Sequence, residues 1–254
     1  MGGESDAAAT FLQAVRGDCR RMSKEGRLTQ IPVMSKSQGK GGGVMAGGHG
    51  KIAWADGKEL EEKFAAVAEV ITAMEQLPAE INRHALEIYT RHCKEEEVQV
   101  CKVARVQGRA SSVALIAMEK GERQPARIDS GQGGDGDVGH CLSCLYFCGD
   151  AGKGKGGASA EGESGDVNRS GALRLTNTSD GTSSLVEAKN DRLVVWRSQD
   201  VENERLEVLG AEENLFTVHV YLHGCITTRE SILESVSRLK DVKINPNPNP
   251  NNKS

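Results

Sequence analysis

The side chains best suited to chemistry gather in one short stretch, which holds His140, Cys141, Cys144 and Cys148. Zinc prefers imidazole and thiolate ligands, and structural zinc sites usually combine two closely spaced ligand pairs. No second Cys-x-x-Cys pair or histidine pair stands at such a spacing, and in a strand Cys141 and Cys144 would face opposite sides. We therefore interpret these cysteines as reduced thiols on a half-buried strand, with a zinc site as the alternative.

Two other patterns suggest ligand binding less strongly. His219 and His223 are four residues apart, a spacing that brings side chains together on a helix rather than on a strand. The glycine-rich segments contain no Gly-x-x-x-x-Gly-Lys-Ser/Thr motif, so they predict no phosphate-binding loop. We interpret both histidines as ordinary core or surface residues.

The composition predicts one domain with few large side chains for its core. The chain has 254 residues, of which 30 are glycine, four Phe, three Tyr and two Trp.

Its net charge of −4 comes from interleaved acidic and basic residues, which argues against nucleic acid as a partner. No apolar run approaches the roughly 20 residues that span a bilayer, so we expect no membrane insertion. Seven cysteines without a secretory signal predict a reducing, intracellular compartment such as the cytoplasm.

Hydrophobic periodicity predicts helices that are followed by strands. Apolar residues at helical spacing indicate one helix over 7–25, ending near Gly26, and a second over 59–77, which Pro78 interrupts. Short runs of β character follow at residues 98–106, 112–118, 141–148, 172–176, 193–196 and 216–222. Periodicity alone therefore predicts an α+β or all-β domain.

Glycine-rich and polar segments delimit this domain because they have too little apolar surface to pack. We expect flexible loops over 35–50 and 149–171 and a flexible N-terminus over 1–9. Residues 227–254 should form a C-terminal helix and an extended Asn-Pro tail. The domain itself is expected over residues 10–226.

Several short motifs occur in a fixed order along residues 49–224. A Lys-Ile-Ala-Trp motif lies within residues 49–60, before the predicted long helix, and a strand and turn over 113–129 lead to an Arg-Ile-Asp motif. Residues 134–147 and 171–224 continue the series. Together these motifs resemble the hypoxia-inducible-factor-type (EGL-nine-like) prolyl hydroxylases. The resemblance implies a double-stranded β-helix (jelly-roll, cupin-like) core backed by N-terminal helices.

The resemblance also implies where metal ligands would lie, and they are changed. The family uses Fe(II), held by two histidines and a carboxylate, with 2-oxoglutarate and ascorbate. The first histidine falls on Arg127, the carboxylate on Asp129, and the second histidine at or next to Glu204. No histidine lies between 141 and 218, so no shift of register restores the second imidazole. Because an arginine cannot donate a lone pair to iron, we expect no metal, and ion pairs from Arg127 to Asp129, Glu204 or both.

The positions that bind the co-substrate in the family are changed as well. The anchoring arginine falls at about Glu213, and no Arg or Lys occurs from Leu206 to Thr228. Two tyrosines of the family fall on Met118 and Phe147, and each change removes a hydroxyl donor. We therefore expect the protein to use no cofactor.

These changes predict a catalytically inactive relative of 2-oxoglutarate oxygenases, a pseudo-prolyl-hydroxylase. Its expected role is that of a structural or protein-interaction subunit in a larger assembly, with other proteins as partners. The alternative is an active Fe(II)- and 2-oxoglutarate-dependent prolyl hydroxylase, or a related oxygenase, with non-standard metal ligands.

Overall fold

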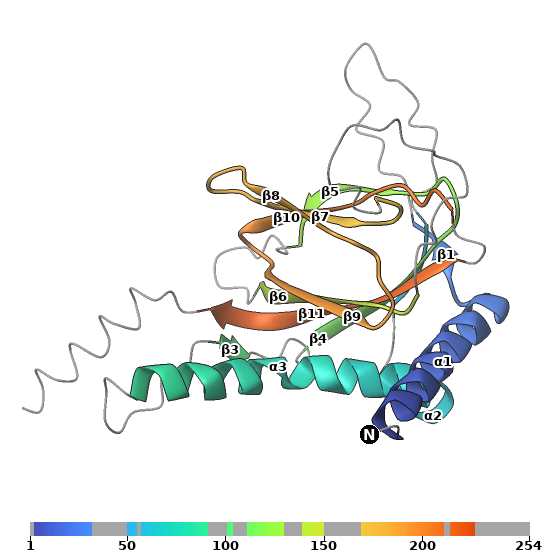
Figure 1. The fold of residues 1–254 in the computed structure, drawn as a ribbon, viewed down its shortest axis with the longest axis horizontal. Helices are drawn as coiled ribbons and strands as arrows, with labels where there is room; N and C mark the ends of the chain where they lie inside the picture. The colour runs from blue at the N-terminus through green and yellow to red at the C-terminus, as the bar shows by residue number, and fades with distance from the viewer. Residues whose placement is uncertain are drawn as a thin grey trace, which may run out of the picture.

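The strands of this chain form two antiparallel sheets that face each other (Figure 1). The computed structural model describes residues 3–31, 50–54, 57–90, 101–103, 111–129, 139–149, 169–210 and 214–226. The larger sheet contains, in spatial order, β1 (Thr29–Gln30), β2 (Lys51–Trp54), β4 (Ser111–Met118), β11 (Leu215–Ile226), β6 (His140–Phe147) and β9 (Arg192–Arg197), with β3 (Cys101–Val103) paired to β11. The smaller sheet contains β5 (Gln124–Ile128), β10 (Val201–Arg205), β7 (Leu173–Asn177) and β8 (Ser183–Val186).

Helices cover the outer face of the larger sheet. They are α1 (Gly3–Lys24), α2 (Gly57–Lys63) and α3 (Ala65–Thr90), and Figure 1 shows α3 running beneath β4 and β11. Their apolar stripes supply Val15, Val67 and Met74 to the space between helices and sheet, and Phe64, between α2 and α3, joins them. The smaller sheet lies on the opposite side of the larger one, as expected for the predicted double-stranded β-helix backed by helices.

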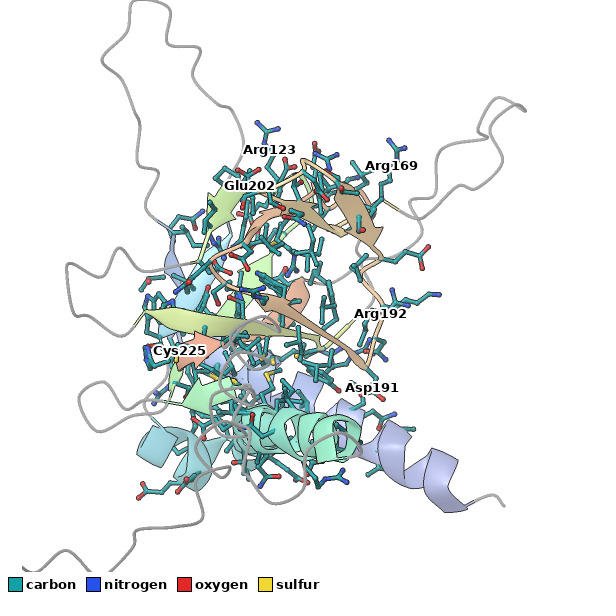
Figure 2. The ribbon with its side chains drawn as sticks, turned by 90° about the vertical axis from the view of Figure 1, so that its left-hand side faces the viewer. Arg123, Arg169, Asp191, Arg192, Glu202 and Cys225 are labelled. Atoms are coloured by element: carbon teal, nitrogen blue, oxygen red, sulfur yellow. The ribbon has the colours of Figure 1, made fainter. Side chains whose placement is uncertain are left out.

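Alternation along the central strand β11 separates two cores. Val218 and Val220 belong to the cluster between the larger sheet and the helices, whereas Leu215 and Tyr221 belong to the cluster between the two sheets. We call the space between the two sheets the interior. Figure 2 shows side chains filling it, while Arg123 and Arg169 point outward at the end formed by the smaller sheet.

The helical predictions need two corrections. Residues 3–9, expected to be a flexible N-terminus, begin α1 instead, because Ala7 to Ala9 favour a helix and extend the amphipathic segment. Pro78 lies inside α3 and does not end it, and the break comes earlier, at Phe64 between α2 and α3. Pro78 is buried, and α3 contacts β11 and β3 of the larger sheet.

The fold is mostly β with flanking helices, as the sequence predicted. All six predicted β runs contain a strand, but β1, β2, β5, β8 and β10 were not predicted from periodicity. The predicted loop residues 35–49 and 150–168, and the predicted helix and tail over 227–254, lie outside the described residues. No helix in the described part of the chain is long and apolar enough to cross a membrane.

Candidate functional site

Polar side chains gather in the interior, where strands of both sheets turn their inward faces toward each other. Alternation along the strands places most of these residues on the side of the apolar interior cluster, and on β5 a shift of register with β10 brings Gln124 and Arg127 to one face. They are Gln124 and Arg127 on β5, Asp129 just after it, Ser143 on β6, Asn203 and Arg205 on β10, and Thr217, His219 and Tyr221 on β11.

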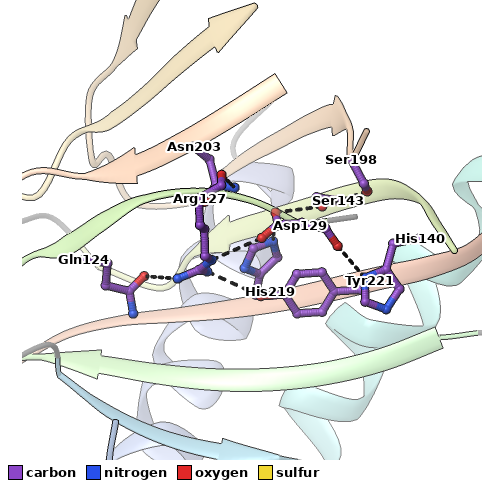
Figure 3. A network of polar contacts seen from close by, with 9 residues as sticks. All are labelled: Gln124, Arg127, Asp129, His140, Ser143, Ser198, Asn203, His219 and Tyr221. Carbon is purple, nitrogen blue, oxygen red and sulfur yellow. Dashed lines mark hydrogen bonds and ion pairs between the residues drawn. The ribbon is translucent and has the colours of Figure 1, made fainter. Parts of the chain in front are cut away.

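Arg127 and Asp129, which the sequence singled out, form an ion pair. The Arg127 Nε donates to Asp129 Oδ1 at 3.1 Å, and the carboxylate side chain is only 2% exposed while the arginine side chain is 35% exposed. The guanidinium also donates to the Tyr221 hydroxyl at 3.4 Å (Figure 3). Burial raises the pKa of Tyr221 to about 12, so its phenol stays neutral beside Asp129. The hydrogen bond from Arg127 to Tyr221 thus joins β5 to the central strand β11.

The second oxygen of Asp129 contacts the larger sheet. Ser143 donates a hydrogen bond to Asp129 Oδ2 at 2.9 Å, and its hydroxyl also lies 2.9 Å from that of Ser198. The His219 Nε2 lies 3.7 Å from the same carboxylate oxygen. Burial, followed by the charges of Arg127 and Arg205, lowers the pKa of His219 well below its ordinary value. His219 is therefore a neutral imidazole at physiological pH.

The register of β10 corrects the expectation for Glu204. Asn203 is the residue directly opposite Arg127, is buried, and donates through Nδ2 to the Arg127 main-chain carbonyl at 3.0 Å. Glu204 lies on the outer face, where Arg174 donates to it at 2.5 Å. The interior position next to Glu204 is Asn203, because adjacent residues of a strand face opposite sides.

The expected co-substrate positions are apolar where the structure describes them. Met118 and Phe147 are both fully buried in the interior cluster, and neither supplies a hydroxyl group. Glu213 lies outside the described residues. The two tyrosine hydroxyls that the resemblance would place at positions 118 and 147 are therefore absent.

Arg205 is a functional candidate that our sequence analysis missed. It ends β10 on the interior face, is 1% exposed, and its guanidinium carbon lies 4.8 Å from the centre of the Phe147 ring. Burial, followed by the charge of Arg127, lowers the pKa of Arg205 to about 9, so the group is still protonated at neutral pH. Arg205 shares a face of its strand with Asn203, but the motifs singled out neither residue, so the sequence offered no direct signal for it.

The residues present do not fit Fe(II). A protonated guanidinium and an amide bonded to the main chain stand opposite each other at the positions that the resemblance implies for the two imidazoles, and the carboxylate is already paired. Among the described residues, no group of three His, Cys, Asp or Glu side chains is arranged to hold a metal ion.

The cysteines are free thiols away from the interior. Cys141, Cys144 and Cys148 are all buried in the cluster between the larger sheet and the helices. We expected Cys141 and Cys144 to face opposite sides, and this was wrong because the pairing of β6 with β11 shifts register between Leu222 and His223.

Comparisons with known proteins bear on the fold. The chain matches no protein-family model and no curated protein. Among solved structures, a prolyl-4-hydroxylase of Pseudomonas putida superposes with a TM-score of 0.52 and 19% identity, over 85% of this chain and 87% of that one. A prolyl hydroxylase of Trichoplax adhaerens, solved with a peptide fragment of the hypoxia inducible factor oxygen degradation domain, gives 0.50 and 14%, over 91% and 81%. At these identities the likeness establishes a shared fold.

Proposed function

We propose that this chain, which has the fold of prolyl-hydroxylase-type 2-oxoglutarate oxygenases, acts without iron and without hydroxylating a substrate. Its role is that of a structural or protein-interaction subunit, with other proteins as partners. The fold supplies a rigid two-sheet body, and the interior holds ion pairs and apolar contacts in place of the family's metal ligands.

The observation that carries this proposal is the ion pair between Arg127 and Asp129. Asp129 is the one position at which the family's ligand set is kept, and its carboxylate accepts hydrogen bonds from Arg127 and Ser143. A metal ion would have to displace a guanidinium that stays protonated throughout the physiological pH range. Electrostatic repulsion from Arg127 and from the buried Arg205 opposes any cation in the same space.

An exposed apolar edge supports the interaction role. Strand β9 ends the spatial order of the larger sheet, and Leu193 and Val195 are exposed on it. Edge strands with exposed apolar side chains are common sites of association between proteins. In cross-linking of the protein in cell extract, a partner that binds here should be lost from a Leu193→Lys, Val195→Lys double variant and kept by Ile128→Lys, which alters an exposed residue of the smaller sheet.

The decisive experiment measures metal and co-substrate together. Mass spectrometry of the purified protein should find no stoichiometric transition metal, and calorimetric titration of 2-oxoglutarate in the presence of Mn(II) or Fe(II) should show no binding. A stoichiometric metal ion together with 2-oxoglutarate binding would overturn the proposal and turn the search to a prolyl substrate.

One contact favours a second candidate, an oxygenase with non-standard ligands. His219 is neutral, neither of its ring nitrogens has a hydrogen-bond partner, and Nε2 lies 3.7 Å from Asp129. These two side chains would be the protein ligands. Metal bound by the wild type and lost from both His219→Gln and Asp129→Asn would support this candidate over the first.

A further inference from the structure

The interior contains buried polar atoms that lack hydrogen-bond partners. Among the described residues, all such side-chain atoms belong to five residues that face this one space: Gln124, Trp196, Arg205, Thr217 and His219. Buried polar groups in native proteins are nearly always paired, and a group that is not calls for a bound molecule or a specific role. That these atoms share one space, rather than being scattered, points to one cause.

Most of these atoms can only donate hydrogen bonds. They include all three guanidinium nitrogens of Arg205, the amide nitrogen of Gln124 and the indole nitrogen of Trp196. The Gln124 carbonyl oxygen already accepts from Arg127 at 3.4 Å, which leaves the amide nitrogen directed elsewhere. The molecule that would satisfy this set must therefore offer acceptors.

The charges of the interior lead to the same conclusion. Two guanidinium groups, of Arg127 and Arg205, face one carboxylate, of Asp129, and that carboxylate is paired with Arg127. Arg205 is left as a fully buried cation whose nitrogens have no hydrogen-bond partner and whose guanidinium lies over the Phe147 ring. A cation–π contact offsets only part of the free energy lost when a guanidinium leaves water. Among the described residues of the interior, one positive charge is thus left without a negative partner.

Strand pairing brings the donors to the same end of the interior. Gln124 is directly opposite Arg205 in the β5–β10 pair, and Thr217 is directly opposite Phe147 in the β11–β6 pair. The Arg205 guanidinium lies over the Phe147 ring, so the strand pairs place Gln124 beside Arg205 in the smaller sheet and Thr217 beside Phe147 in the larger sheet. The surrounding side chains are apolar, with Met118, Leu173 and Leu215 all fully buried.

We infer that the interior binds a small monocarboxylate with a short apolar body, held by Arg205 with Gln124 and Thr217 and without a metal ion. A single carboxylate matches the single uncompensated cation, and a planar guanidinium suits it well. Met118, Leu173 and Leu215 belong to the same buried cluster, and such apolar neighbours favour a hydrocarbon chain over a second charge. The guanidinium nitrogens are inaccessible to solvent, so the ligand reaches them by local opening, and the partly exposed Arg127 marks where the interior meets solvent.

The test uses butanoate as the probe, in buffer treated with a chelator, and follows binding by calorimetry and by the thermal midpoint. Butanoate should raise the midpoint in proportion to its concentration, whereas butanamide, its neutral isostere, should not. Arg205→Met should reduce the butanoate affinity at least about tenfold, because the charged partner is lost. Arg174→Met, which removes an exposed arginine of the same sheet, should leave the affinity unchanged.

Stability without ligand gives a second readout. Arg205→Met should leave the denaturation midpoint unchanged or raised, because it removes an unpaired buried charge. A lowered midpoint together with no response of the wild type to butanoate would overturn the inference and make Arg205 a structural residue. If Arg205→Met fails to fold, the isosteric Thr217→Val decides: reduced butanoate affinity supports the site, and unchanged affinity rejects it.

Two outcomes separate this inference from the proposed function. No binding of butanoate, with no metal and no 2-oxoglutarate bound, would overturn the inference and leave the proposed function standing. Binding that requires Mn(II) or Fe(II), or that selects 2-oxoglutarate over butanoate, would overturn both.

Discussion

Asn203 lies directly opposite Arg127 across the β5–β10 pair, and its side-chain amide donates a hydrogen bond to the Arg127 main-chain carbonyl at 3.0 Å. Both residues direct their side chains to the interior, whereas Glu204, the next residue, pairs with Arg174 on the outer face. Positions 127 and 203 could therefore hold two imidazoles that face each other beside Asp129. This geometry determines which substitutions can build a metal site.

Arg127→His combined with Asn203→His should create a divalent metal site with Asp129. Two imidazoles and one carboxylate on neighbouring strands form a facial set of three ligands. We expect calorimetry with Mn(II) or Zn(II) to show binding at least about tenfold tighter than in the wild type.

The matched control for that site is Arg127→His combined with Glu204→His, which places the second imidazole on the outer face. It should bind metal no better than Arg127→His alone. Equal binding by both double variants would contradict the register of β10. Neither variant should hydroxylate a prolyl peptide, because Met118 and Phe147 provide no hydroxyl donors.

Removing either partner of the Arg127–Asp129 pair should have unequal effects. Arg127→Met leaves a buried carboxylate with Ser143 as its remaining donor, and we expect a loss of about 1 to 3 kcal/mol in the free energy of unfolding. Asp129→Asn should cost less, because the half-exposed arginine can turn toward water. Urea denaturation at neutral pH measures both, and a larger loss for Asp129→Asn would mean that the carboxylate is stabilised mainly by other groups.

Stability should fall as the pH drops below the ordinary histidine pKa of about 6.5, because His219 is buried as the neutral imidazole. In that range the unfolded chain binds a proton that the folded chain does not. The free energy of unfolding should therefore decrease by up to about 1.4 kcal/mol per pH unit from this group.

Urea denaturation between pH 7.5 and 5 checks that dependence. His219→Gln should flatten the pH profile, whereas His84→Gln, which removes an exposed histidine, should leave it unchanged. An unchanged slope in the His219→Gln variant would show that His219 takes up its proton in the folded state.

Gly50 should not tolerate a side chain. Its φ is +86°, and a Cβ atom there would lie 2.7 Å from the Ala117 carbonyl oxygen of β4. Gly50→Ala should cost about 1 to 3 kcal/mol of unfolding free energy. Gly17→Ala is the matched control, because Gly17 lies in α1 with open space around it, and it should stabilise the protein by about 0.5 to 1 kcal/mol. Urea denaturation measures both effects, and the midpoint of Gly50→Ala should lie below that of the wild type while the midpoint of Gly17→Ala lies above it.

Apolar patterns predicted the larger sheet better than the smaller one. Strands β4, β6 and β11 are buried on both faces, so they read as continuous apolar runs. Strands β5 and β10 were missed because their buried residues are Gln124, Asn203 and Arg205, which no hydrophobic pattern can reveal. These two strands are recognised only from the structure, in which β10 pairs with β5 and β7.

The site was predicted in part, for a related reason. The Arg127–Asp129 pair depends on two residues that are close in sequence, and their resemblance to a known motif located both. The opposite strand required the correct register, and an error of one residue exchanges the interior face for the outer one. Glu204 was expected where Asn203 lies, and Arg205 passed unnoticed although it shares the face of Asn203.

The separation of the two cores has a consequence for how such a protein can change over generations. The cluster between the helices and the larger sheet is made of residues such as Val15, Phe64 and Val218, which belong to a different cluster from the apolar residues of the interior. Most of the stabilising packing of that layer would persist whatever side chains replaced Arg127 or Asn203. Selection for a lasting scaffold and selection for interior chemistry thus act on different residues, so one can be relaxed while the other is maintained.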